Sequence, residues 1–194
     1  GDAAVLAAAE RFDKVVLKPS EMRLTESQIE AAARSVPPAV RRAVKEAHRR
    51  VRLFARAGMR KDWSMRTRHG GLLGERFVPL DRVGVYIPGG AAPLVSTAVM
   101  TVTLGQVAGV REIVACTPCD RGKRVAPALL HALQLAGATE VYRLGGIQAV
   151  GMMAFGTQSV RPVQKIVGPG GAHVTAAKRQ VYGRVALDLV AGPS

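Results

Sequence analysis

Short apolar runs alternate with longer apolar segments of helix length from Val83 to the end of the chain. Each short run has the length and composition of a buried strand, and glycine or proline follows most of them. Five strands are predicted, namely Val83–Ile87, Glu112–Cys116, Glu140–Leu144, Val163–Val167 and Ala186–Val190. The helices between them are predicted to end near Ala108, to cover Arg124–Ala136 and Gln148–Phe155, and to end near Tyr182. This alternation indicates an α/β fold with a parallel sheet and right-handed crossovers.

The first part of the chain, to about Leu80, has a helical pattern instead. An alanine-rich helix is predicted over Ala3–Arg11. Thr25 and Gln28 have the spacing of a capping box ahead of a helix at Ile29–Arg34. Pro38 suits the first turn of another helix. We therefore divide the chain into a mainly helical segment, 1–80, and an α/β domain, 81–194.

The helix after Pro38 is amphipathic. Its apolar positions recur at spacings of four, three, four and three residues, at Val40, Val44, Ala47, Val51 and Phe54. Arginines occupy the opposite face of this helix. The periodicity is lost from Gly58 to Leu80, which predicts a connecting segment.

Composition and charge narrow the class of protein. The 194 residues are 48% hydrophobic, which excludes a disordered chain, and the two cysteines exclude a disulfide scaffold. No charged residue occurs from Val83 to Val110, but Pro88, Gly89, Gly90 and Pro93 interrupt this run, so it does not predict a membrane span. No signal peptide is visible at the N-terminus, and the default expectation is a reducing cytoplasm.

The net charge of +14 is concentrated in one stretch. Eleven basic residues between Arg41 and Arg68 oppose only Glu46 and Asp62, a net charge of +9. Such a stretch is able to bind phosphate backbones non-specifically. No nucleic-acid motif accompanies it, so we favour a solvated helix face, or one that pairs with acidic residues of another segment. An acidic segment outside this sequence would explain the charge excess.

Glycine and proline cluster directly after three predicted strands, at Pro88-Gly89-Gly90, Gly145-Gly146 and Gly168–Gly171. Ligands of open α/β sheets bind beyond the carboxyl ends of the strands, and helix N-termini there favour anions. Ordinary tight turns are the alternative for each cluster. No G-x-G-x-x-G fingerprint follows the first strand. The pattern therefore predicts a nucleotide or cofactor crevice without identifying its ligand.

Other reactive side chains give weaker signals. Cys116 and Cys119 form a C-x-x-C at a strand end, but a second ligand pair for zinc is missing, so we favour two ordinary thiols. The four histidines lack metal-ligand spacing, and one of them, His173, follows a glycine turn where it could face a ligand. No catalytic triad or paired carboxylates can be argued.

Several ordered segments resemble the histidinol dehydrogenase family over essentially the whole chain. They are Pro79–Gly90, Gly145–Ala149 with Ala154–Thr157, Lys165–Gly170, Ala177–Gln180 and Asp188–Ser194, with Gly1-Asp2 and Arg11–Asp13 near the start. The resemblance implies zinc- and NAD-dependent enzymes that oxidise L-histidinol to L-histidine through L-histidinaldehyde. It further implies two incomplete Rossmann-like domains and an active site at a homodimer interface, so that residues 1–80 belong to the second, incomplete domain.

The resemblance also assigns individual residues. It implies that Tyr86 and Gln148 contact NAD and that Ser194 contacts the substrate. The family usually has asparagine where this chain has Gly171, which puts the affinity for NAD in question. The family's zinc ligands and catalytic bases are expected beyond Ser194, so we expect a fragment that is inactive alone. A relative acting on another amino or sulfonated alcohol, and a basic nucleic-acid-binding module, are the alternatives.

Overall fold

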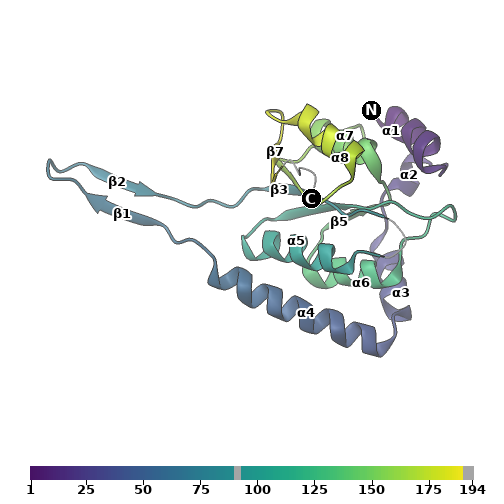
Figure 1. Ribbon diagram of the computed structural model, residues 1–194, viewed down its shortest axis with the longest axis horizontal. Coiled ribbons are helices and arrows are strands. Elements are labelled where there is room, and N and C mark those ends of the chain that lie inside the picture. The colour runs from purple at the N-terminus through teal and green to yellow at the C-terminus, as the bar shows by residue number, and fades with distance from the viewer. Residues whose placement is uncertain (90–92, 190–194) are drawn as a thin grey trace.

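A five-stranded parallel sheet forms the centre of the computed structural model, which describes residues 1–89 and 93–189 (Figure 1). Its strands are β3 (Arg82–Tyr86), β4 (Glu112–Cys116), β5 (Glu140–Tyr142), β6 (Lys165–Val167) and β7 (Ala186–Leu187). They lie in the order β5-β4-β3-β6-β7, and every neighbouring pair is parallel. The predicted α/β fold with a parallel sheet is confirmed.

Helices cover both faces of this sheet. The helices between and after the strands are α5 (Val95–Val107), α6 (Pro127–Ala136), α7 (Gly146–Phe155) and α8 (Ala172–Val181). α5 and α6 pack together over one face, and α7 and α8 pack together over the other. Each face carries its own apolar core, one around Val85, Ile113 and Leu133, the other around Met152, Met153 and Ile166. The central strand β3 is buried along its whole length, which explains the uncharged run that begins there.

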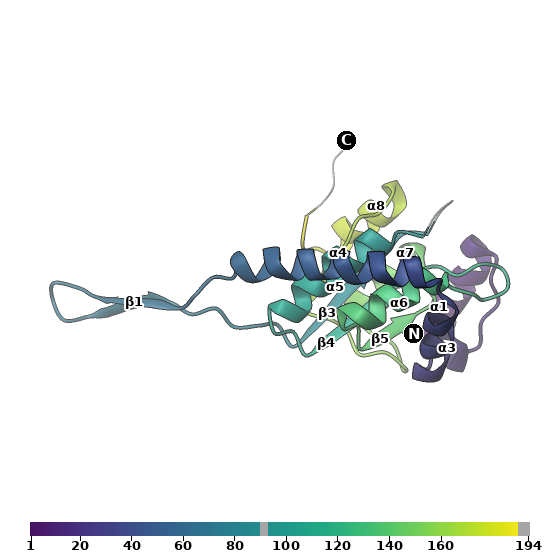
Figure 2. The same ribbon diagram turned by 90° about the horizontal axis from the view of Figure 1, so that it is seen from below.

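The N-terminal segment wraps around this centre. It consists of α1 (Asp2–Ala8), a π-helical turn (Ala9–Asp13), α2 (Pro19–Met22), α3 (Glu26–Ser35) and α4 (Pro38–Ala57). α1 packs on α7, whereas α3 packs on α6 and α4 packs on α5 and α6, so the segment reaches both helical layers (Figure 2). The capping box forms as predicted: the Gln28 backbone N–H donates to Thr25 Oγ1 at 3.3 Å, and the Thr25 N–H donates to Gln28 Oε1 at 3.0 Å.

The same segment protects an edge of the sheet. The Leu24 N–H donates to the Val141 carbonyl at 2.8 Å, and the Arg143 N–H donates to the Met22 carbonyl at 2.9 Å. These bonds satisfy backbone groups that an exposed edge strand would offer to another chain. The division at residue 80 stays a prediction, and residues on both sides of it contribute to each core.

One prediction for the region after Pro38 is wrong. The supposed connecting segment contains an antiparallel hairpin of β1 (Trp63–Arg66) and β2 (Leu72–Glu75), which extends away from the sheet (Figure 1). Both strands are exposed along their whole length, so no buried face imposes a period-two pattern on their sequence. The apolar stripe of α4 is only partly covered: Val44 is buried, whereas Phe54 is 80% exposed.

Candidate functional site

The strand order creates a switch point between β3 and β6. After β3 the chain passes to the face covered by α5, and after β6 it passes to the face covered by α8. Crevices that bind ligands in open α/β sheets form at such points. A cleft of about 640 Å³ lies here, at the carboxyl ends of the strands. Its lining includes Asp13, Tyr86, Pro88, Gly89, Pro118, Cys119, Arg124, Gly146, Gly171 and His173.

A buried ion pair fixes the turn that follows β6. Lys178, 4% exposed, donates from Nζ to Asp188 Oδ1 at 2.5 Å and to the Gly168 carbonyl at 3.0 Å. The Gly168 N–H donates to Asp188 Oδ2 at 2.8 Å. Burial alone would raise the pKa of Asp188, but the hydrogen bonds from Lys178 and Gly168 lower it. The carboxylate therefore stays charged and holds this side of the cleft in place.

The glycines around the cleft serve different purposes. Gly168 has φ +112°, and a Cβ there would collide with the Tyr86 carbonyl oxygen, so this position requires glycine. A Cβ at Gly89 or Gly145 would meet the Pro118 ring. These three glycines let neighbouring turns pack together, as ordinary tight turns do. Gly171 differs, because a Cβ there would meet nothing within 4 Å.

Tyr86 lies at the end of β3 and is 5% exposed. Its hydroxyl oxygen accepts a hydrogen bond from the Gly146 N–H, at the start of α7, at 3.1 Å. Burial raises the pKa of Tyr86, the hydrogen bond from Gly146 opposes this, and the charge of Asp13 adds to the rise. The phenol therefore stays protonated at neutral pH and retains its own hydrogen for donation.

Gln148 lies two positions after Gly146, in the first turn of α7, and is 5% exposed. Its Nε2 donates to Asp13 Oδ2 at 2.7 Å, while its Oε1 is buried without a hydrogen-bond partner among the described residues. A buried unsatisfied acceptor in a native fold calls for an explanation such as a ligand. A Cβ on Gly146 would lie 2.9 Å from this Oε1, so the amide is next to a residue of the cleft wall.

The structure brings most of the predicted residues to this cleft. Tyr86 and His173 line it directly, whereas Gln148 lies behind Gly146. Ser194 and Gly90 fall outside the described residues. Sequence reasoning missed the contribution of Asp13 and the clamp formed by Lys178. Both residues belong to segments that the family resemblance includes. No local spacing rule, however, predicts a contact between residues 135 positions apart, or one between Lys178 and the Gly168 carbonyl ten positions before it.

The two cysteines are ordinary thiols in this structure. Cys116 is fully buried, and Cys119 is half-buried at the cleft wall. Burial raises the pKa of both thiols, which opposes formation of a reactive thiolate. Within residues 1–89 and 93–189, no three His, Cys, Asp or Glu side chains gather as a metal site would need. The described residues therefore do not fit a zinc ion.

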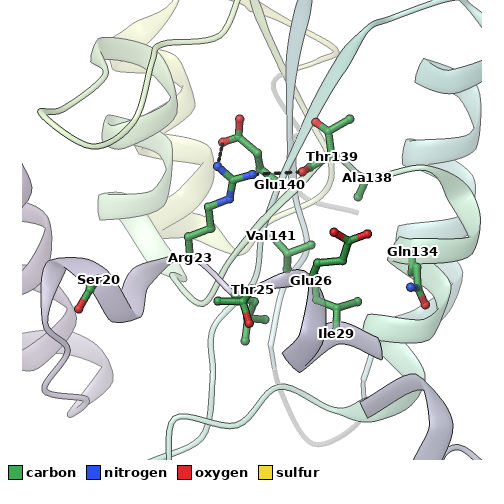
Figure 3. Close-up of a pocket in the computed structure, with 11 residues that line it drawn as sticks. Ser20, Arg23, Thr25, Glu26, Ile29, Gln134, Ala138, Thr139, Glu140 and Val141 are labelled. Atoms are coloured by element: carbon green, nitrogen blue, oxygen red, sulfur yellow. Dashed lines mark hydrogen bonds and ion pairs between the residues drawn. The ribbon is translucent and has the colours of Figure 1, made fainter. Parts of the chain in front are cut away.

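A second cavity, of about 700 Å³, borders β5 (Figure 3). It is lined by residues of the α2–α3 region and by the start of β5, including Arg23, Glu26, Thr139 and Glu140. Arg23 contacts Glu140 at 4.0 Å and the Thr139 carbonyl at 3.5 Å. This cavity lies at the amino end of β5, opposite the end where α/β sheets bind ligands, so we assign it no ligand.

The charges beside that cavity hold the amino ends of three strands together. Arg82, 5% exposed, donates to Glu112 at 2.6 Å and to both oxygens of Glu140 at 2.8 and 3.0 Å. The hydrogen bonds from Arg82 lower the pKa of Glu140 to about 2 against the opposing effect of burial, and Tyr142 adds a further bond. A bidentate guanidinium–carboxylate pair of this kind is geometrically specific, and here its role is structural.

The basic stretch forms a distinct surface on α4. A groove of about 530 Å³ is lined mainly by Arg42, Lys45, His48, Arg49, Arg52 and Arg56, with Leu135 of α6 beside them. Glu46 pairs with Arg49 and Arg50, at 2.8 and 2.7 Å. Burial and the charge of Arg52 lower the pKa of His48, so the histidine adds little positive charge at neutral pH.

Comparisons with known proteins agree on one family. The family model described as histidinol dehydrogenase matches residues 1–194. Histidinol dehydrogenases from Methanothermobacter thermautotrophicus and Rhodopseudomonas palustris are each 45% identical over the whole chain, which covers 45% of their length. A crystal structure of histidinol dehydrogenase from Elizabethkingia anophelis superposes with a TM-score of 0.94 at 36% identity, over 100% of this chain and 44% of that one. The chain thus spans less than half the length of these relatives. None of the described helices has the length and apolar character to cross a membrane.

Proposed function

Since the chain belongs to the histidinol dehydrogenase family, we propose that its cleft at the switch point binds NAD. The protein to which it contributes would be a zinc- and NAD-dependent oxidoreductase of histidine biosynthesis. That protein would act in the cytoplasm as a homodimer and oxidise L-histidinol to L-histidine through L-histidinaldehyde. NAD, when bound, would accept the hydride.

The observation that carries this proposal is the environment of Gln148. Its buried Oε1 has no hydrogen-bond partner within residues 1–89 and 93–189 and lies beside Gly146, and the Tyr86 hydroxyl contacts the same glycine. An acceptor and a donor next to one cleft suit the hydroxyl and carboxamide groups of a dinucleotide. The free N-terminus of α8 at Gly171 favours a pyrophosphate, because its backbone N–H groups carry partial positive charge.

Substrate chemistry is proposed for the longer protein alone. The described residues do not fit zinc, and we derive no step through that metal. Ser194 remains a proposed substrate contact outside the described residues. We assign no catalytic base to this chain. We expect the isolated chain to bind NAD but to form no NADH from histidinol.

Calorimetric titration of the purified 194-residue chain with NAD tests the cofactor site. We expect saturable binding that weakens by about tenfold in Y86A and in Q148A, since each variant removes one hydrogen-bonding group. R66Q, an exposed substitution in the β1–β2 hairpin that does not line the cleft, supplies the control. No detectable binding by the unchanged protein would refute the cofactor site.

Activity is tested separately. We expect no histidinol-dependent rise in absorbance at the NADH wavelength with the isolated chain, and measurable NADH formation would contradict this. The longer gene product, loaded with zinc, would distinguish histidinol from other amino or sulfonated alcohols by its kcat/KM for each. A clear preference for another alcohol would favour the second candidate, a related dehydrogenase.

A further inference from the structure

Asp13 reaches the cleft from the N-terminal segment, far from the sheet in sequence. It is the last residue of the π-helical turn, and Lys14 follows it with φ +57°, in the left-handed region that ends a helix. Its side chain lines the cleft and accepts a hydrogen bond at 2.7 Å from Gln148, 135 positions later. A segment outside the α/β domain thus contributes directly to the wall of the site.

This contact determines which way the Gln148 amide points. A carboxylate accepts hydrogen bonds and donates none, so only the Nε2 end of the amide can face Asp13. The Oε1 end then faces away from Asp13, buried and without a partner among the described residues. Rotating the amide by half a turn would place two acceptors against each other and leave two donors unsatisfied.

We propose that Asp13 is a positioning residue for the dinucleotide and acts through Gln148. By holding Nε2, it presents Oε1 as a fixed acceptor for a hydroxyl or an amide N–H of the ligand. This inference rests on the proposed function, because it names how the same cleft orients its cofactor. An amide that is already oriented loses no rotational freedom when the ligand binds.

The surroundings of Asp13 support a role beyond attaching the N-terminal π-helical turn to α7. Burial raises the pKa of this carboxyl, and the hydrogen bonds from Gln148 and the Gly145 backbone offset the rise only in part. Asp2, in the same N-terminal region, offers a comparison. It binds Ser159 away from the cleft, and there the hydrogen bonds outweigh burial and lower the pKa.

A double-mutant cycle on NAD affinity tests the inference in the 194-residue chain. We expect D13A to weaken NAD binding by about tenfold, Q148A to weaken it at least as much, and D13A/Q148A to be no weaker than Q148A alone. D13N keeps an oxygen that accepts from Nε2, so we expect its affinity to stay within about threefold of the unchanged chain. E10Q, an exposed carboxylate one helical turn earlier, is the matched control.

The outcomes separate the two proposals. If D13A weakens NAD binding by the same factor with and without Gln148, or does not weaken it, Asp13 does not act through Gln148. That result would leave the proposed NAD site itself intact. A chain that binds no NAD at all would overturn both the proposed function and this role. Should D13A fail to fold, D13N decides: an affinity as low as that of Q148A contradicts the proposal. The Gln148 side-chain amide NMR signal, shifted in D13A and retained in D13N, gives a readout independent of NAD.

Discussion

Gly171 lies at the mouth of the cleft, at the N-cap of α8, and a side chain there would meet open space. Its φ of −68° is available to any residue, so the position imposes no strain on a substitution. Asparagine, which the family resemblance leads us to expect here, would add a donor and an acceptor at a helix N-terminus.

We therefore expect G171N to fold normally and to bind NAD several-fold more tightly, through one additional hydrogen bond. Titration calorimetry on both proteins measures the change, and a thermal melt checks the fold. G171A serves as the control, because it adds a Cβ without the amide. An unchanged affinity in G171N would show that the ligand does not approach this position.

The sequence predicts best those residues whose position depends on neighbouring segments of the chain. Tyr86 lies at the carboxyl end of a predicted strand, and Gly168 and His173 follow another. The topology of the sheet alone brings such positions to one edge. The contact between Asp13 and Gln148 depends on how an N-terminal helix packs on α7. No spacing rule connects two segments so far apart, and only the folded chain reveals that pair.

Glu140 provides a residue-scale test of stability. Its pKa in the folded protein is about 2, below the ordinary value of 4.5, chiefly because Arg82 donates two hydrogen bonds to it. A lowered carboxyl pKa stabilises the fold fully above the ordinary value, and this contribution is lost as the pH falls through the folded value. We expect the free energy of unfolding to decline between about pH 4.5 and pH 2.

The variant E140Q separates this contribution from those of other carboxylates. At pH 7 we expect it to lose about 3 kcal/mol, because it leaves the buried Arg82 with a weaker set of partners. Its stability should then fall less steeply than that of the unchanged protein as the solution is acidified. Urea denaturation at several pH values measures both effects. Parallel pH curves for the two proteins would contradict the role given to Glu140.

At the scale of elements, the β1–β2 hairpin differs from the rest of the fold. Trp63, Met65 and Leu73 share one face of it, since Met65 pairs with Leu73 and Trp63 lies two residues before Met65. All three are about half exposed. A two-stranded hairpin without a packing partner is at best marginally stable in water. Thr67, Gly70 and Gly71 close its turn by backbone hydrogen bonds, but these do not cover the apolar face.

We expect this hairpin to open more readily than the sheet. Trp63 is the only tryptophan, so its fluorescence reports on this element alone, and acrylamide should quench it strongly. Trypsin should cut first near Arg66 and Arg68, before any site in α5–α8. Shielded, blue-shifted Trp63 emission at low protein concentration would contradict this expectation.

The predictable elements are those that the core constrains. β3–β7 and α5–α8 are buried on one or more sides, and their apolar runs identify them within a few residues. α3 was visible because Thr25 and Gln28 cap it locally. The hairpin was missed because both of its strands are exposed at every position, so no buried face marks them in the sequence.

At the scale of the whole molecule, the charge is distributed unevenly. α4 carries cations at spacings of three, four, three and four residues, at Arg42, Lys45, Arg49, Arg52 and Arg56, and these side chains share one groove. The α4 groove therefore concentrates positive potential along one side of the molecule. The groove is interpreted either as a phosphate-binding surface or as a solvated helix face. The two interpretations differ in whether DNA binding should depend on the salt concentration alone or also on which cations are replaced.

We expect the solvated-face interpretation to hold, with weak retention on DNA that depends on net charge alone. Binding through counterion release falls steeply as salt increases, and it requires no particular arrangement of cations. Replacing the exposed groove cations Arg42, Lys45, Arg49 and Arg56 by glutamine should then reduce retention on a DNA column no more than replacing four scattered exposed arginines, Arg76, Arg121, Arg179 and Arg184. Both variants lower the charge by the same amount and should elute at similar salt concentrations. If the α4 variant alone loses retention, the α4 groove is a specific polyanion site, and the nucleic-acid interpretation gains the physical support that the sequence by itself does not provide.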